Sequence, residues 1–405
     1  MVSCAEQYEN LAATRDSYLD RARECAKVTI PSLIPDTGHN SYARFPTPYQ
    51  GVGARGVNNL ASKLLLALLP PNAPFFRLQV DDFTLEELAG NEDMRASVEE
   101  SLNKIERSIM TEMETDGLRS PMFEALKHLI VAGNVCLYLP KDGGSRVFPL
   151  SRYVVKRDPM GEVLTVIIKE EVAASSLPDD ILMSMDPAIQ RDKDDPVAVY
   201  TKMYREGNKY KMYQQIDNNI IEGTEATYPL DKSPILALRW TAIDGENFGR
   251  SYCDEYLGDL ISLEGLSKAI LEASAAAAKI LFMVNPNGTT RAKDLAQAEN
   301  GDIISGNSAE VTVLQSQKQA DMGIAQQTAS TVTQRLAQAF LMNTSVQRQG
   351  ERVTAEEIRF MAGELEDALG GVYSILSQEF QLPLVSRIMD RMNICETSNA
   401  DNEQA

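Results

Sequence analysis

The chain has 405 residues, of which 43% are hydrophobic, and its 39 basic and 58 acidic side chains give a formal net charge of −19. The length and composition allow a sizeable core and more than one domain. The acidic balance excludes the class of proteins that bind nucleic acid through a strongly basic outer surface. An acidic protein can still lie beside DNA where its role is to avoid adhering to it.

The cysteines and the N-terminal residues indicate the compartment. Cys4, Cys25, Cys136, Cys253 and Cys395 are widely spaced and form no C-x-x-C pair, which is typical of buried or free thiols in a reducing compartment. The first residues lack the basic and apolar regions of a signal peptide, and the longest apolar runs are too short to span a bilayer. We therefore expect a soluble protein, made in a cytoplasm and without membrane insertion.

Helices are predicted over the first third of the chain. Residues 5–30 carry apolar side chains at helical spacing. After a turn-rich loop, an apolar helix is predicted over 57–69, followed by a strongly charged helix over 84–116. A further helix is predicted over 121–132, where Pro121 suits the first turn.

A glycine motif precedes the apolar helix. Gly51, Gly53 and Gly56 fit G-x-G-x-x-G, the pattern of a dinucleotide-binding loop. That loop needs a preceding strand and an acidic residue about 20 positions later. Here two prolines precede the glycines and no Asp or Glu occurs over 37–80, so we predict a glycine-rich entry to a helix that packs closely on a neighbour. A cytosolic nucleotide-binding enzyme using these glycines is the alternative.

The middle of the chain has a sequence pattern typical of β-sheet. Over 134–240, short runs rich in Val, Ile and Tyr alternate with turn residues such as "KDGG", "DPMG" and "REGN". This pattern predicts a largely antiparallel, hairpin-rich α+β region.

Helices return in the second half. One begins at about residue 250 and ends in the small-residue run "ASAAAAK", and a second covers 317–343 with a face dominated by Gln, Thr and Ser. Turns and short strands are predicted between them. A polar loop follows, and a capping box from Thr354 to Glu357 opens a third helix. Gly370 and Gly371 predict a kink within it.

No catalytic constellation is found. The histidines are His39 and His128, neither has a partner at metal-ligand spacing, and His128 is interpreted as a packed helical residue. "GRSYC" matches a nucleophile elbow only in its first three letters, and paired carboxylates are interpreted as solvated surface charge. We expect no metal, no cofactor and no enzymatic activity.

Several stretches together resemble a known family. They are "ARGVNNLASKLLLALLPPNAPFFRL", "MFEALKHLIVAGNVCLYLP", "FGRSYCDEYLGDLISLEGL", "TIPSLIP" and "QRQGERVTAEEIRFMAGELEDALGGVYSILSQEFQLPLV". The similarity extends from about residue 8 to residue 388. The family is that of the portal, or head-to-tail connector, proteins of short-tailed bacteriophages of the Autographiviridae type.

The resemblance implies a predominantly helical α+β portal fold with reduced or absent crown. Its parts in chain order would be an N-terminal helical part of the wing (1–89), an α+β wing domain (90–249), a first stem helix (250–279), a clip (280–316), a second stem helix (317–343), a tunnel loop (344–353), a kinked wing helix (354–388) and a polar C-terminal tail (389–405). Relatives carry more chain after the long helix, forming a crown and often a helical barrel. The crown is therefore minimal here, supplied by another polypeptide, or missing because the chain is a fragment.

The family also implies function and partners. It implies a homo-oligomeric ring, a dodecamer, at a unique vertex of the capsid in the virion, assembled in the host cytoplasm. Double-stranded DNA would be packaged and ejected through its channel. The ring would nucleate capsid assembly and bind the terminase large subunit, the tail adaptor protein, and the major capsid and scaffolding proteins.

The resemblance assigns three groups of site residues. They are the tunnel-loop residues Gln347, Arg348, Gln349 and Arg352, the channel-facing stem residues Gln326, Gln327, Gln334 and Gln338, and the clip residues Thr290, Arg291, Lys293 and Asp294. A Gln-rich face is polar without fixed positive charge, so it would not trap phosphate. The tunnel-loop arginines could instead pair with Glu351 or Glu356. Besides the nucleotide-binding enzyme, a helical scaffold protein without a channel remains an alternative.

Overall fold

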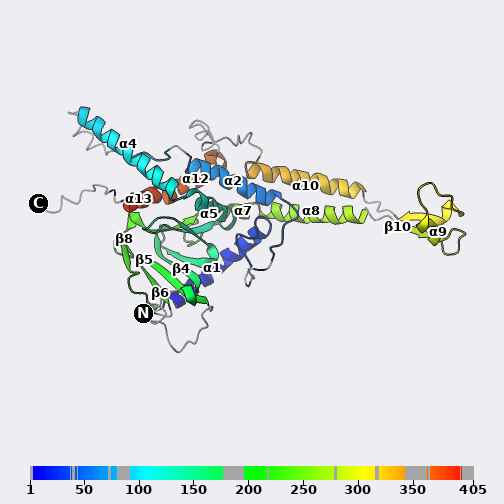
Figure 1. Ribbon diagram of the computed structural model, residues 1–405, viewed down its shortest axis with the longest axis horizontal. Helices are drawn as coiled ribbons and strands as arrows, with labels where there is room; N and C mark the ends of the chain where they lie inside the picture. The colour runs from blue at the N-terminus through cyan, green and yellow to red at the C-terminus, as the bar shows by residue number, and fades with distance from the viewer. Residues whose placement is uncertain are drawn as a thin grey trace.

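The structure is a computed structural model. It describes residues 3–36, 38, 42, 44–71, 74–79, 92–176, 196–216, 219–277, 281–314, 319–342, 363, 365–392 and 394. Figure 1 shows a body that contains the two larger sheets and most helices, with two helices, α8 and α10, running side by side away from it. A small unit with β10 and α9 lies at their far end.

The body contains two antiparallel sheets, as the sequence predicts. One has the order β2 (Arg146–Pro149), β1 (Asn134–Tyr138), β9 (Ile235–Arg239). The six-stranded sheet has the order β3 (Tyr153–Arg157), β4 (Val163–Ala173), β5 (Pro196–Glu206), β6 (Lys209–Ile216), β7 (Asn219–Ile220), with β8 (Ala226–Pro229) also pairing with β6. Short 3-10 turns join them: η1 (Leu150–Arg152), η2 (Ala174–Ser176) and η3 (Leu230–Lys232).

Helices α1 (Cys4–Lys27), α2 (Val52–Leu68) and α5 (Arg119–Ala132) supply much of the main core. The Ser3 hydroxyl caps α1 by accepting a hydrogen bond from Glu6 N at 3.1 Å. α1 ends before the predicted residue 30, because Val28, Thr29 and Ile30 are β-branched and Pro31 disfavours helical geometry before it. The charged helix α4 (Glu92–Thr115) projects from the body (Figure 1).

The prediction for the glycine motif is wrong in one respect. Helix α2 begins at Val52, so Gly53 and Gly56 lie inside the helix and not in a loop before it. Both glycines are buried, and their neighbours leave no room for a side chain. A Cβ on Gly53, for example, would lie 2.5 Å from Val28 O. The intrinsic cost of glycine in a helix, about 1 kcal/mol, is overridden by this packing. The predicted close packing is confirmed, and a phosphate-cradling loop at Gly51, Gly53 and Gly56 is contradicted.

The helix predicted from residue 250 is interrupted. The short α7 (Tyr252–Glu255), capped by Ser251, is separated by Tyr256 from α8 (Leu257–Ala277). Tyr256 N donates to Cys253 O at 3.2 Å, a tighter turn than an α-helical one. The distal helix is α10 (Gln319–Ala339), and between the two lie β10 (Leu281–Val284), α9 (Ala292–Gln297), η4 (Ser308–Glu310) and β11 (Val311–Leu314).

The C-terminal helices lie against the body. At Gly370, whose φ is +58°, the chain breaks rather than kinks, and α12 (Val372–Leu376) follows. The π-helical segment η5 (Ser377–Gln381) leads into α13 (Leu382–Arg391). Pro383 has no N–H to bond to the preceding turn, which suits this irregular hydrogen bonding. α13 continues past the expected boundary at 388 because Arg391 binds Asp116 at 2.7 Å. The predicted capping box at Thr354 lies outside the described residues.

Candidate functional site

The pair of helices α8 and α10 is the most distinctive feature of the molecule (Figure 1). Near the body they share an apolar seam in which Leu260, Leu263, Val332 and Leu336 are buried. Toward the far end most of the described side chains of α8 and α10 are exposed. The pair therefore reaches out from the body and offers its outer faces to other molecules.

Aromatic packing fixes the base of this pair. The Phe340 ring lies 5.7 Å from the Tyr252 ring and 6.2 Å from the Tyr256 ring, centroid to centroid. The Tyr252 hydroxyl donates to Ala339 O at 2.7 Å, and burial raises the pKa of this phenol. Phe340 also covers Gly56 of α2. The start of α8 and the end of α10 are thus held to one another and to the body.

Two sets of polar contacts hold the same region. The Glu264 carboxylate accepts hydrogen bonds from Tyr49 N at 2.9 Å and from Gln50 N at 3.1 Å, tying the segment before α2 to α8. Arg335 binds Asp259 at 2.8 Å across the helix pair. Glu264 was not predicted, and no sequence signal marks it because its partners are more than 200 residues away in the chain.

Helix α10 ends in a Schellman motif. Met342 N donates to Ala337 O at 2.8 Å and Leu341 N donates to Gln338 O at 3.0 Å. Leu341 has a φ of +52°, a left-handed conformation that glycine usually fills. Asn59 Nδ2 donates to Phe340 O at 2.9 Å and to Leu341 O at 3.1 Å, which holds this turn in place. The predicted tunnel-loop residues Gln347, Arg348, Gln349 and Arg352 follow it and lie outside the described residues.

The four predicted stem residues lie on α10 and are all exposed. They are Gln326, Gln327, Gln334 and Gln338. Gln327, Gln334 and Gln338 are spaced by seven and four, so they share one face, and Gln326 lies beside it. Among the described side chains of α10, Arg335 carries a charge that Asp259 balances, and Asp321 lies near the far end. This face is therefore polar and close to neutral.

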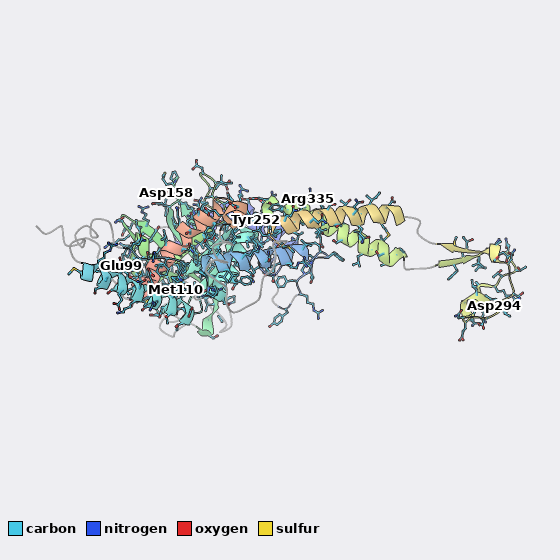
Figure 2. The ribbon with its side chains drawn as sticks, turned by 90° about the horizontal axis from the view of Figure 1, so that it is seen from above. Glu99, Met110, Asp158, Tyr252, Asp294 and Arg335 are labelled. Carbon is cyan, nitrogen blue, oxygen red and sulfur yellow. The ribbon has the colours of Figure 1, made fainter. Side chains whose placement is uncertain are left out.

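The four predicted clip residues lie in the unit at the far end, where Figure 2 labels Asp294. Arg291, Lys293 and Asp294 are exposed at the start of α9. Thr290 instead has internal partners: its hydroxyl accepts from Asn307 N at 2.8 Å, and its backbone N donates to Glu310 Oε2 at 2.9 Å. The hydrogen bond from the Thr290 amide is the main reason that the pKa of Glu310 is lowered. Thr290 thus holds the unit together, while the other three face outward.

The described histidine and serine that were considered as candidates for catalysis are packed in the core and cap a helix, respectively. His128 is buried in α5, and burial lowers its pKa to about 4. The nearest carboxylate oxygen, of the exposed Glu124, is 3.9 Å away and too distant to offset burial. Ser251 of "GRSYC" caps α7 and accepts from Asp254 N. Within the described ranges, no group of three or more His, Cys, Asp or Glu could hold a metal. His39 lies outside them.

The sequence also led to expectations about the cysteines and about membrane-spanning segments. Cys4, Cys25, Cys136 and Cys253 are buried free thiols, as predicted, and Cys395 lies outside the described residues. Of the helices that the structure describes, none combines the length and apolarity needed to cross a membrane.

Comparison with known proteins gives a consistent result. A family model described as bacteriophage head to tail connecting protein matches residues 2–395. The portal protein of Enterobacteria phage T3 is 45% identical over 95% of this chain and 73% of its own length. That of Escherichia phage T7 is 44% identical, again over 95% of this chain and 73% of its own length. That of Pseudomonas phage phiKMV is 30% identical over 90% and 72%, respectively.

Solved structures give a weaker likeness. The neck of an empty GTA particle, computed with C6 symmetry, has a TM-score of 0.41 and 11% identity to this chain, and covers 84% of it and 78% of the neck chain.

Proposed function

The chain belongs to the family of bacteriophage head-to-tail connecting proteins, and we propose how its parts form the channel. The protein is a portal protein of the kind found in short-tailed phages, located in the virion at a capsid vertex, where an oligomeric ring joins head and tail. Its family is a structural one, and the proposed role includes no catalytic step and no cofactor.

In this proposal α8 and α10 are the stem helices and the Gln face of α10 lines the channel. The observation that carries it is the exposed, nearly neutral face formed by Gln327, Gln334 and Gln338. Each fixed cation on a channel wall would be repeated around the ring and would hold DNA phosphates by displacing counterions. Glutamine offers hydrogen bonds to phosphate or water without that charge. DNA can then move past in either direction.

The unit over 281–314 is the proposed clip. Its exposed Arg291, Lys293 and Asp294 would meet the terminase large subunit during packaging and the tail adaptor protein afterwards. Thr290 would act by holding the unit's shape, through Asn307 and Glu310. Charged side chains at the rim of an interface govern association rate and choice of partner more than affinity, which suits a surface with two successive partners.

The remaining assignments follow from the family. The ring is proposed to be a dodecamer that nucleates capsid assembly with the scaffolding and major capsid proteins. Gln347, Arg348, Gln349 and Arg352 are proposed to narrow the channel, on a loop that begins after the turn at Leu341. The ring would package and release double-stranded DNA.

Electron microscopy of the purified protein tests this function. Twelvefold rings with a central hole, able to support DNA packaging when added to an assembly extract, are expected. A compact monomer or an extended rod would favour the scaffold alternative and overturn the channel. A nucleotide-induced rise in melting temperature on a small oligomer would favour an enzyme instead.

A further inference from the structure

A cleft of about 390 Å³ opens in the body, away from α8 and α10. It lies between β9, the turn after β3 and the η5–α13 junction, and its lining includes Arg157, Arg239 and Glu379. Figure 2 labels Asp158 in that turn. The volume falls at the lower end of the range typical of small-molecule sites. Nothing in the proposed channel function uses it.

Two guanidinium groups lie in the wall of this cleft, that of the buried Arg239 and that of the half-buried Arg157. Arg157 donates to three backbone carbonyls, of Asn247, Gly161 and Ala237, at 3.1, 2.8 and 2.6 Å. Its pKa is lowered to about 10, first by burial and then by the charge of Arg239. Carbonyl oxygens satisfy the N–H groups but do not neutralise the charge, so the inner wall carries two cations side by side.

The carboxylate of Glu379 compensates this charge only in part. Glu379 Oε1 lies 3.3 Å from Arg239 Nη2, a long contact for a charged pair. Arg239 has a side chain that is 7% exposed, and its Nε is buried without a hydrogen-bond partner among the described residues, as is Glu379 Oε2. Two cations and one imperfectly placed anion leave this wall one negative charge short.

The mouth of the cleft restricts the kind of anion that can enter. Glu162, already paired with Arg205, and the exposed Asp231 line it. These carboxylates repel a polyanion such as a nucleotide more strongly than a monoanion. Between mouth and wall the lining includes the apolar Met203, Leu230 and Pro383, and the exposed Met160 lies at the mouth. The cleft is thus anionic outside, apolar within and cationic at its inner wall.

We propose that this cleft binds a monocarboxylate with an aliphatic body. The ligand's carboxylate displaces that of Glu379 from Arg239, and its aliphatic body lies against Met203 and Leu230. The same chemistry occurs in a free aliphatic acid and in the carboxyl terminus of a peptide that ends in an apolar residue.

Methyl NMR on the assembled protein tests the proposal, with 13C-labelled Met160 and Met203 as reporters in the cleft and Met94 on α4 as a distant reference. Hexanoate should shift both cleft signals with a Kd of about 1 mM or tighter, whereas hexanol and inorganic phosphate should not. Acetyl-alanyl-leucine and its amide then distinguish the two sources of the carboxylate. Binding of acetyl-alanyl-leucine but not of its amide indicates a peptide carboxyl terminus. Binding of hexanoate alone indicates a free aliphatic acid. Equal shifts by hexanol, or none by either acid, would overturn the proposal.

Two variants sharpen the test because they change affinity in opposite directions. Arg239→Gln should weaken hexanoate binding by about tenfold or more, and Glu379→Gln, which removes the competing carboxylate, should strengthen it several-fold. Lys104→Gln and Glu100→Gln, an exposed pair on α4, are the charge-matched controls and should leave Kd unchanged. If Arg239→Gln does not fold, the result for Glu379→Gln still decides: weaker or unchanged binding contradicts the proposal.

Discussion

The Phe340 ring occupies the space that a side chain on Gly56 would need: a Cβ on Gly56 would lie 2.6 Å from Phe340 Cγ. This contact joins α2 to the end of α10, and it explains why glycine is placed inside a helix. Because Phe340 also packs on Tyr252 and Tyr256, a change at Gly56 would be transmitted to the base of both projecting helices.

Gly56→Ala should therefore destabilise the protein although alanine favours helix. The overpacking is expected to lower the free energy of unfolding by about 1–3 kcal/mol, measured by urea denaturation. Gly51→Ala, where a Cβ would meet nothing within 4 Å, is the matched control. It should lower the free energy of unfolding by only a small fraction of the effect of Gly56→Ala. Adding Phe340→Leu to Gly56→Ala should recover part of the loss, and a double variant no better than the sum of its singles would argue against the contact.

Asn59→Asp tests the tie between α2 and the end of α10. The amide donates to Phe340 O and Leu341 O, whereas a carboxylate would face two carbonyl oxygens with no hydrogen to offer. We expect a loss of about 2 kcal/mol or more. Hydrogen exchange of the Leu341 and Met342 amides should also accelerate. Asn58→Asp, on the solvent-facing side of the same turn of α2, should change neither quantity, and a similar effect of both variants would contradict the assignment.

His128 should make stability fall in mild acid. Its folded pKa, about 4, lies below the ordinary value of 6.5, so the unfolded chain takes up a proton between these values and the folded chain does not. The contribution of the neutral His128 to the free energy of unfolding is fully present above pH 6.5 and is lost as pH falls toward 4. At pH 5 the free energy of unfolding is lower by about 2 kcal/mol. The measurement compares urea unfolding at pH 7.5 and 5 for wild type and His128→Gln. The variant should show a smaller loss between the two pH values, and equal losses would refute this role.

Cations placed on the Gln face of α10 should impede DNA. Gln327→Lys with Gln334→Lys would create repeated positive charges around the channel, and packaging should slow several-fold at low salt and recover as salt rises. Gln327→Ser with Gln334→Ser should package normally, and so should Ser97→Lys on the exposed surface of α4. Slowing by the serine variants as well, or no dependence on salt, would show that charge in the channel is not the cause.

Periodicity alone predicted much of the architecture. Runs of Val, Ile and Tyr separated by turns became the sheets, and apolar spacing located α8 and α10, because local patterns report which face is buried. The glycines at positions 53 and 56 led to a wrong prediction of where α2 begins. Their place inside the helix is explained by close contacts with Val28 and Phe340, which are distant in the sequence.

The candidate site was predictable to a lesser degree. The exposed Gln face follows from helical spacing, but its role came from the family resemblance. Asn59 and Glu264 could not be predicted, because their partners lie in segments far away in the chain. The charge imbalance at Arg157 and Arg239 is likewise a property of the fold, since it depends on strands β3 and β9 lying near η5.

The most direct test of the account is an electron cryomicroscopy map of the assembled ring at side-chain resolution. We predict that Gln327, Gln334 and Gln338 of every subunit lie on the wall of a central channel, with the unit over 281–314 at one end. Finding these three side chains on the outer surface of the ring, or buried between subunits, would contradict it.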